Sequence, residues 1–382
     1  MTSRLLNASR HRRPPLGYAI VWNGFADGPA QALRDYLVER GANVVTIAHP
    51  LTPEQGALHV IATYADGERS DERTIRLPLV APYSYAFDPF VPLLPPTVDA
   101  WFGFNPLACG RGLMARAVGR ARRVLLWSVD FVPDRFGPGT LATRIYDRID
   151  RFCCLHANAR IELSEAARAG RNERHHLPAG STAAQIVPMG AWVDRVPTTP
   201  PDGFERRRVV FLGHLVPRQG VARLFDLGED VAVDVIGTGP LEQELRRTAP
   251  EGVTFHGYVD DHRDVERLLA QCSVAVAPYE RTDETFTRFA DPGKLKAYLA
   301  AGLPIVMTGI PPNAQELARE AGAEVVEPSD LAAAVRRALA SPEEWRARRG
   351  AALGYVRRFE WSTLLGDLLA KLDLSPAPKP TR

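Results

Sequence analysis

Short continuous apolar runs alternate with amphipathic stretches of helical period along most of the chain. Apolar runs bounded by turn residues are typical of strands in a parallel sheet that helices cover on both faces. In the first half we predict strands at Tyr18–Trp22, Val44–Ala48, Ala100–Phe104, Val124–Ser128 and Arg160–Leu163. In the second half we predict strands at Val209–Leu212, Val231–Ile236, Val253–Phe255, Val274–Ala277, Pro304–Thr308 and Glu324–Val326. The pattern indicates an α/β fold.

A turn-rich segment with three prolines, Val196–Gly203, separates two halves that begin alike, with an apolar strand, a glycine-containing loop and a helix. At 382 residues the chain is long enough for two domains that each bury a core. We therefore predict two Rossmann-like, doubly wound domains, at residues 16–195 and 209–360, joined by a linker at 196–208. Ligands of such folds bind at the carboxyl ends of the strands, here in a cleft between the domains. The arm 1–15 and the tail 373–382 are predicted to be disordered.

Only four of the 47 basic residues are lysines, and two of them, Lys294 and Lys296, lie in the segment Asp291–Pro304. Asp291 is a good N-cap residue, Pro292 suits the first helical position, and a glycine and a proline follow, so we predict a helix from about 292 to 301. Lys294 then lies in the first turn, beside free backbone N–H groups, which is an arrangement suited to phosphate. A solvated helix start is the alternative interpretation.

Two glycine-containing loops follow strands of the second half. The loop Gly213–Gly220 could aim Arg218 and backbone N–H groups at a phosphate, or leave Arg218 exposed. The turn Gly237–Pro240 lacks the third glycine and the acidic residue of a dinucleotide fingerprint, so we interpret it as a tight strand-to-helix turn. Helix capping explains Asp260 and Asp261 better than metal binding does.

The segment Trp127–Phe136 is the most suggestive part of the first half. Asp130 falls just past a predicted strand and has Trp127 and Phe131 as aromatic neighbours. A partly desolvated carboxylate has a raised pKa and can act as a general base. A turn-capping role or an ion pair with Arg135 is the alternative.

Charge and cysteine content narrow the class of protein. The net charge is +2, and the first 200 residues are more basic (+5) than the rest (−3). The basic first half, with its arginine-rich stretch Arg111–Arg123, could meet an anionic lipid surface, as in a peripheral protein on the inner face of the membrane, or a lipid-diphosphate substrate. A solvated helix face is the alternative interpretation of the stretch. Without interleaved aromatics or zinc spacing, we predict no nucleic-acid partner. Four cysteines without ligand spacing and an N-terminus without an apolar segment predict a cytoplasmic protein.

Taken together, these motifs give the second half a resemblance to glycosyltransferases of the GT-B fold, over nearly all of residues 205–372. The matching elements, in order, are Val209–Leu215 with Gly220, Val235–Pro240, Phe255–Gly257, Ala277–Tyr279, the helix Lys294–Pro304, and Phe359–Ser362 before a last amphipathic helix. In this fold the last helix, here 361–372, crosses back onto the N-terminal domain.

The resemblance implies that the C-terminal domain holds a nucleotide diphosphate-sugar and the N-terminal domain holds the acceptor. The implied donor-binding residues are Lys294 and Arg218 at the diphosphate, Tyr279, Pro292 and Gly293 at the base and sugar, and Gly213 and Asp291 beside them. The acceptor-binding residues assigned with it are Asn23, Gly24, Phe131 and Arg135. No metal or other cofactor is implied, because lysine, arginine and helix N-termini stabilise the leaving group.

Two departures from the family pattern affect the mechanism. Retaining members carry two glutamates eight positions apart, where this chain has Phe289 and Ala297, and the usual phosphate-loop lysine corresponds to Gln219. The chain is more similar to the inverting glucuronosyltransferase of the xanthan pathway, whose base is an aspartate in an Asp-Phe-x-Pro-x-x-Phe setting. Asp130 is the matching residue.

We therefore predict a metal-independent, inverting glycosyltransferase of polysaccharide or glycolipid assembly, with Asp130 as the base and a glycan, a glycolipid or another hydroxyl compound as acceptor. In a retaining mechanism Asp291 or Glu284 would lie near the sugar instead. A nucleotide-sugar 2-epimerase would share the two-domain fold, and a non-catalytic nucleotide-sugar-binding protein would account for the missing glutamates. Aromatic residues of the loop Pro82–Pro96 either stack on acceptor sugar rings or pack together.

Overall fold

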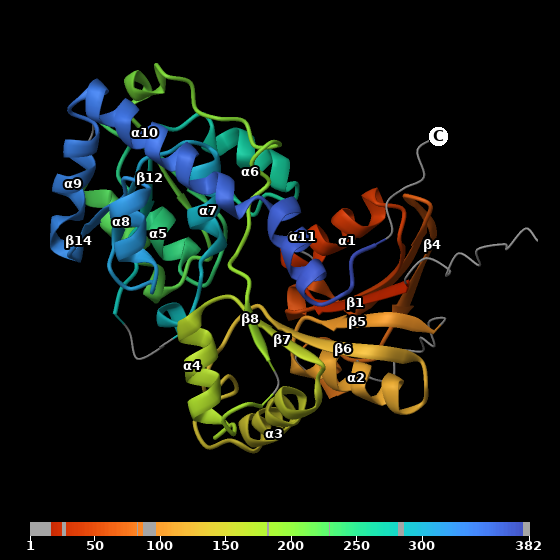
Figure 1. Ribbon diagram of the computed structural model, residues 1–382. Helices are drawn as coiled ribbons and strands as arrows, with labels where there is room; N and C mark the ends of the chain where they lie inside the picture. The colour runs from red at the N-terminus through yellow and green to blue at the C-terminus, as the bar shows by residue number, and fades with distance from the viewer. Residues whose placement is uncertain are drawn as a thin grey trace, which may run out of the picture.

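The computed structural model describes residues 17–24, 28–81, 83–86, 97–181, 183–228, 230–281 and 286–376. Two α/β domains lie side by side, each built on one sheet (Figure 1). The predicted fold class is confirmed. The expected arm at 1–15, most of the tail, Glu284 and most of the loop Pro82–Pro96 lie outside the described residues.

The N-terminal sheet has eight strands in the order β4-β3-β2-β1-β5-β6-β7-β8. Their bounds are β1 Gly17–Asn23, β2 Asn43–His49, β3 Leu58–Ala65, β4 Glu68–Arg76, β5 Val98–Gly103, β6 Ala121–Ser128, β7 Ala159–Glu162 and β8 Ala184–Ile186. The six strands β2, β1, β5, β6, β7 and β8 run parallel to one another. Strands β3 and β4 form an antiparallel hairpin at one edge.

The C-terminal sheet has six parallel strands in the order β11-β10-β9-β12-β13-β14. Their bounds are β9 Arg208–Leu212, β10 Ala232–Ile236, β11 Val253–Gly257, β12 Val274–Ala277, β13 Ile305–Thr308 and β14 Glu324–Val326. The strand order reverses between β9 and β12, so the loops after these strands open into a crevice where ligands of doubly wound sheets bind.

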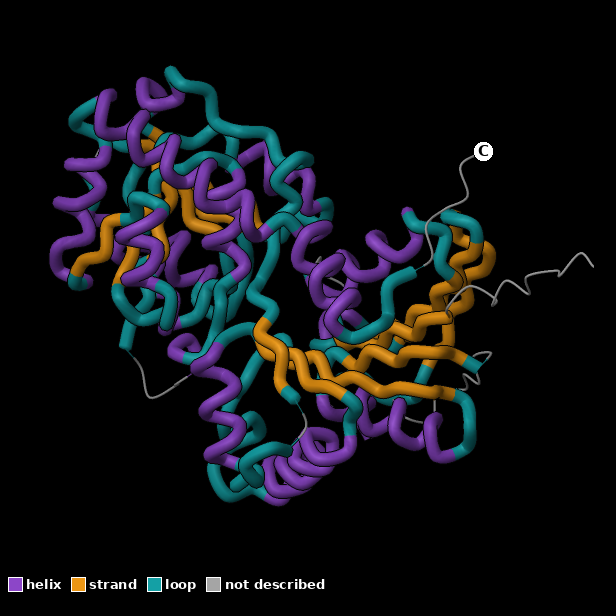
Figure 2. Tube along the Cα trace, in the orientation of Figure 1, coloured by secondary structure: helices purple, strands orange, loops and turns teal. Residues whose placement is uncertain are grey.

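Helices cover both sheets (Figure 2). Their bounds are α1 Pro29–Glu39, α2 Pro106–Ala117, α3 Leu141–His156, α4 Glu165–Arg174, α5 Glu242–Thr248, α6 His262–Leu269, α7 Gly293–Ala300, α8 Ala314–Glu320, α9 Leu331–Ala338, α10 Pro342–Val356 and α11 Trp361–Lys371. None of the helices in the described ranges combines the length and apolarity that crossing a bilayer requires.

The last helix, α11, belongs to the core of the first domain (Figure 1). Its buried leucines pack with Tyr18 and Ile20 of β1, and the Tyr18 hydroxyl donates to the Leu374 carbonyl over 2.7 Å. Beside it, the two segments that pass between the domains pair at Ala191 and Glu360. Two adjacent segments of the chain therefore connect the domains.

Every predicted strand is present, and the predicted helix at 292–301 is α7. Prediction missed the hairpin β3–β4, because β4 is exposed along almost its whole length and shows no apolar face. The turn residues Asp66 and Gly67, both with positive φ, are an Asp-Gly hairpin signal that would have located it.

Candidate functional site

A cavity of about 340 Å³ lies between the two domains. The N-terminal domain lines it with Gly28 and the segment 189–192, and α11 adds Trp361. The C-terminal domain lines it with the end of β9 and the start of α7, through Leu212, Gly213, Gln219, Tyr279, Pro292, Gly293 and Lys294. The cavity thus brings together five of the residues that the sequence assigns to the donor.

Lys294 stands where the cavity meets the first turn of α7. Its Nζ donates to Gln219 Oε1 over 2.5 Å and lies 4.3 Å and 4.5 Å from the ring centroids of Phe211 and Tyr279. Burial, and after it the positive charge of Arg218, lower the pKa of Lys294 well below the usual lysine value. No carboxylate of the described residues pairs with it, so the charged form of this amine would have a counter-charge only when an anion binds.

Two glycines let the loop after β9 and the turn after β10 approach each other closely. Gly213 has a φ of +150°, and Gly237 has a φ of +126°. A Cβ on Gly237 would lie 2.1 Å from the Gly213 carbonyl oxygen. The turn after β10 therefore supports the loop after β9, as its interpretation as a tight turn predicts.

Tyr279 presents an unsatisfied hydroxyl in this cavity. The residue is 2% exposed, and its hydroxyl has no hydrogen-bond partner among the described residues. The Thr308 hydroxyl holds the Tyr279 backbone by donating to its carbonyl over 2.7 Å. Burial raises the pKa of the Tyr279 hydroxyl, so it remains a hydrogen-bond donor. A buried donor of this kind is costly unless a ligand or water accepts from it.

Arg218 and Asp291, the other predicted donor residues, do not line the cavity. Arg218 is half-buried on the short helix Pro217–Gln219, close enough for its charge to act on Lys294. Asp291 is buried and accepts from the Met189 N–H (2.7 Å), Lys296 Nζ (3.1 Å) and Asn313 Nδ2 (2.9 Å).

The predicted N-cap role of Asp291 is wrong. Pro292 is the N-cap residue of α7, and the Asp291 carboxylate turns away to bind the backbone of the other domain. This arrangement is more stable than capping would be, because the Met189 N–H and the Lys296 ammonium would otherwise lie buried without partners. Asp291 therefore fixes α7 against the N-terminal domain.

The far end of the cavity holds a cluster that sequence reasoning missed. Glu266 of α6 is 1% exposed and forms an ion pair with Arg195 through both of its oxygens. The ring of His262 faces Trp192, with centroids 5.7 Å apart, and Trp192 faces Trp361 at 6.1 Å. These residues come from three distant segments without a shared motif, so only their aromatic and acidic character was visible beforehand.

A second hollow of about 270 Å³ adjoins the cavity and shares Leu212, Gly213 and His262 with it. It runs along the ends of β10 and β11, past Thr238 and the exposed Tyr258. Together the two hollows form an elongated site with a cation at one position and aromatic faces at others. Such a site suits a ligand with an anionic centre and flat or polyol ends.

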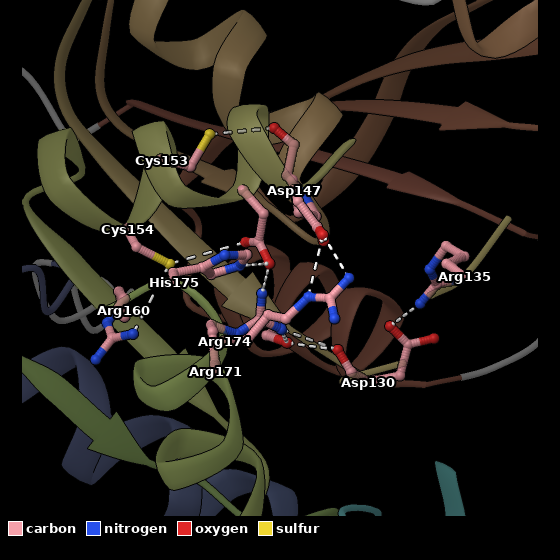
Figure 3. A network of polar contacts seen from close by, with 12 residues as sticks. Asp130, Arg135, Asp147, Cys153, Cys154, Arg160, Arg171, Arg174 and His175 are labelled. Carbon is pink, nitrogen blue, oxygen red and sulfur yellow. Dashed lines mark hydrogen bonds and ion pairs between the residues drawn. The ribbon is translucent and has the colours of Figure 1, made fainter. Parts of the chain in front are cut away.

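Asp130 lies on the loop between β6 and α3, and it does not line the cavity. Its carboxylate forms an ion pair with Arg135 (Figure 3), the alternative that the sequence left open. Its carbonyl oxygen accepts from the Ser128 hydroxyl over 2.7 Å and from Arg171 Nη2 over 3.0 Å. Arg171 is itself 2% exposed and paired with Asp150, so this loop is anchored by a buried network.

Phe131, the next residue, closes the gap between the domains. Its ring meets that of Phe289 edge to face, with centroids 5.0 Å apart. The Ser164 hydroxyl donates to the Phe289 carbonyl over 2.7 Å. Phe289 stands at one of the two positions that hold glutamates in the family pattern, and here it forms an inter-domain contact instead.

Asn23 and Gly24 lie at the end of β1. Asn23 accepts from Asn105 Nδ2 over 2.7 Å, and the Gly24 N–H donates to the His49 carbonyl over 2.7 Å. Neither lines the cavity, although Gly28, the N-cap residue of α1, does. Of the aromatic loop residues, Tyr83 is exposed and the Tyr85 hydroxyl donates to the Leu51 carbonyl.

The two-domain fold with its inter-domain cavity is that of the GT-B glycosyltransferases, and comparisons with known proteins agree. Residues 206–341 match the family described as "Glycosyl transferases group 1". The structure is similar to sucrose-phosphate synthase from Thermosynechococcus elongatus, with a TM-score of 0.70 and 16% identity over 94% of this chain and 99% of that one. It is also similar to Anabaena Alr3699/HepE in complex with UDP-glucose, with a TM-score of 0.64 and 15% identity over 94% and 99%. The resemblance to GT-B glycosyltransferases is confirmed.

A sequence relative gives a closer local match. Over 154 residues the chain is 33% identical to the GDP-mannose-dependent alpha-(1-6)-phosphatidylinositol dimannoside mannosyltransferase of Mycobacterium tuberculosis (strain ATCC 25177 / H37Ra). The match covers 40% of this chain and 38% of the relative.

Proposed function

We propose that this protein transfers a sugar from a nucleoside diphosphate-sugar to an acceptor hydroxyl. The observation that carries the proposal is Lys294, a buried lysine that pairs with no carboxylate of the described residues, in an inter-domain cavity and at a helix start. That arrangement fits a diphosphate better than any neutral ligand. It lies in the part of the chain that matches group 1 glycosyltransferases.

In the proposed reaction Lys294, the N–H groups at the start of α7 and the charge of Arg218 stabilise the departing diphosphate. The bond between the anomeric carbon and the diphosphate oxygen breaks, and its electron pair stays on the diphosphate. These groups are fixed before the reaction, so they favour the charge that develops as the bond breaks. The proposal requires no metal ion for this step.

GDP-mannose is the first donor to test, because the relative with 33% local identity is named for it. UDP-glucose is the second, because a structural neighbour holds it. The Tyr279 hydroxyl and the Trp361 indole N–H, both buried and unpartnered among the described residues, are suited to the oxygens of a donor in the cavity. A polyol acceptor or donor sugar would stack on the aromatic rings at the cavity's far end.

For the acceptor we propose Asp130 as the base. It would take the proton of the acceptor hydroxyl while that oxygen attacks the anomeric carbon, which inverts the anomeric configuration. This step needs Asp130 to exchange its ion pair with Arg135 for the substrate hydroxyl. Support comes from its place on the loop beside the inter-domain contact Phe131–Phe289.

A retaining reaction is the alternative that one observation favours. Asp130 lies outside the cavity lining and is already paired with Arg135. In that case the donor phosphate itself would accept the acceptor's proton on the same face of the sugar. The configuration of the product, read by NMR, distinguishes the two mechanisms.

Calorimetric titration with UDP, GDP, dTDP and ADP tests the proposed function. We expect micromolar binding of one nucleotide, and at least tenfold weaker binding by Lys294→Met, which keeps most of the side chain's apolar contacts. Gln315→Ala, on α8 outside this cavity, is the control and should bind like the wild type. Wild-type protein that binds none of the four nucleotides would refute the proposal. Turnover of the bound donor without acceptor into an epimer would instead identify a 2-epimerase.

A further inference from the structure

Only part of the arginine-rich stretch Arg111–Arg123 is exposed. Arg111 is 7% exposed. Arg116 donates to the Asn158 side chain and to the His156 carbonyl, and Arg122 pairs with Asp99. Arg111 and Arg116 are therefore held against the domain and the exposed Arg122 is already paired, so this stretch alone does not make a surface for an anionic partner.

Helix α3, which lies against α2 on the same side of the N-terminal sheet, has an unusual outer face (Figure 1). Leu141, Ile145 and Phe152 are 70%, 48% and 51% exposed. They follow one another at helical spacing, and the exposed Arg148 completes the same stripe. Large apolar side chains that share one exposed stripe indicate a contact with something apolar.

The charges of α3 are sorted between its two sides. Both of its acids face inward or sideways into ion pairs: Asp150 is buried against Arg171, and Asp147 pairs with Arg174 (Figure 3). The exposed Arg144 and Arg148, by contrast, have no ion pair among the described residues. The outer face therefore offers apolar side chains and positive charge, without an acid.

The end of α2 adds to this character. Met114 and Val118, one turn apart, are 58% and 69% exposed. The Arg116 side chain links this end of α2 to the end of α3 by donating to the His156 carbonyl over 3.0 Å. The ends of α2 and α3 thus both carry exposed apolar side chains, and the Arg116 side chain links the two ends.

We propose that this surface, formed by the outer face of α3 and the end of α2, docks on an anionic lipid bilayer. The exposed Arg144 and Arg148 would bind lipid phosphates. Leu141, Ile145 and Phe152 would insert among the acyl chains next to them. A second copy of the chain is a poor occupant, because paired copies would face arginine with arginine. A partner protein would need an acidic surface with an apolar centre, which an anionic bilayer supplies everywhere.

The position of α3 makes this docking relevant to the candidate site. The helix begins at Leu141, just after the loop that carries Asp130 and Phe131. Docking through α3 would bring the loop beside the inter-domain gap close to the lipid surface. The surface would then favour an acceptor that is itself anchored in the bilayer, a conclusion that rests on the proposed function, whereas the docking itself does not.

Vesicle co-sedimentation of the full chain, without donor or acceptor, tests the docking. The vesicles are equimolar phosphatidylglycerol and phosphatidylcholine, or phosphatidylcholine alone. We expect binding to the anionic vesicles that weakens as salt is added. Each basic residue near an anionic surface contributes roughly fivefold, so Arg144→Gln with Arg148→Gln should reduce partitioning about 25-fold. Ile145→Ser with Phe152→Ser should reduce it as well.

Matched controls lie on other surfaces. Arg319→Gln with Arg336→Gln removes two exposed arginines of α8 and α9, and Leu58→Ser removes an exposed leucine of β3. These variants should partition like the wild type. Wild-type protein that ignores anionic vesicles, or control variants that lose binding equally, would overturn the proposal. Light scattering that shows a wild-type dimer, which Phe152→Ser makes monomeric, would identify a second copy as the occupant instead.

Discussion

The ring of Phe131 in the first domain touches the ring of Phe289 in the second edge to face, with centroids 5.0 Å apart. Both rest on Gly170 of α4, where a Cβ would lie 2.7 Å from the Phe289 ring and 2.8 Å from the Phe131 ring. Gly170, which has no side chain, therefore leaves the space in which the two rings meet. Because Asp130 precedes Phe131, this contact also sets where the proposed base stands.

Replacing Gly170 with alanine should destabilise the protein. Alanine in a helix interior is normally favoured over glycine by about 1 kcal/mol. Here the added methyl group overlaps two packed rings, which costs about 1–3 kcal/mol and should outweigh that gain. Chemical denaturation measures the change. Gly350→Ala in α10, where a Cβ meets nothing within 4 Å, is the matched control and should gain stability. A Gly170→Ala protein as stable as the control would show that the rings move apart freely.

Removing the Tyr279 hydroxyl should separate stability from binding. The hydroxyl has no partner among the described residues, so Tyr279→Phe should leave the free energy of unfolding unchanged or raise it by about 1 kcal/mol. Affinity for the nucleotide-sugar should fall, because one of its buried oxygens loses the hydroxyl that donates a hydrogen bond to it. Tyr298→Phe is the control: its hydroxyl accepts from the Leu212 N–H over 2.7 Å, so the protein should lose about 1 kcal/mol. Equal stability losses in thermal melts of both variants would contradict the proposed role of the Tyr279 hydroxyl.

Nucleotide binding should be linked to the protonation of Lys294. Burial lowers the pKa of its ammonium, whereas a bound diphosphate favours the charged form and raises that pKa. Between the two pKa values binding takes up a proton, so affinity should fall as the pH rises through the pKa of the free protein. Calorimetry above the second ionisation of the diphosphate, in buffers of different ionisation enthalpy, measures the uptake. Lys294→Met should show neither effect, and pH-independent wild-type affinity would place Lys294 away from the phosphates.

Asp130→Asn should lower turnover about 10²- to 10⁴-fold and leave donor affinity unchanged, because only the proton acceptor is removed. Initial rates with the donor identified by calorimetry measure the effect. Asp134→Asn is the matched control on the same loop. Asp134 pairs with Arg174 and has a φ of +54°, which asparagine tolerates, so this variant should keep its turnover. Full activity of Asp130→Asn would favour the retaining reaction.

The sequence predicted the parts of the site that local pattern determines. The cap and stop residues around Lys294 located helix α7 within about a residue at each end, because helix signals are local. The role of Asp291 was predicted wrongly, since its partner Met189 is 102 positions away and leaves no local trace. The same holds for the cluster of Trp192, His262 and Glu266, which only the packing of two domains brings together. Tertiary contacts decided which of several local options each side chain took.

The return of α11 to the first domain has a consequence for how the chain is made. The N-terminal core is incomplete without Leu365, Leu368 and Leu369, and the Tyr18 hydroxyl finds its partner at Leu374. During synthesis the apolar face of the first domain therefore stays uncovered until α11 has left the ribosome. The second domain can complete its core earlier. The domain that is translated first is the one that finishes folding last.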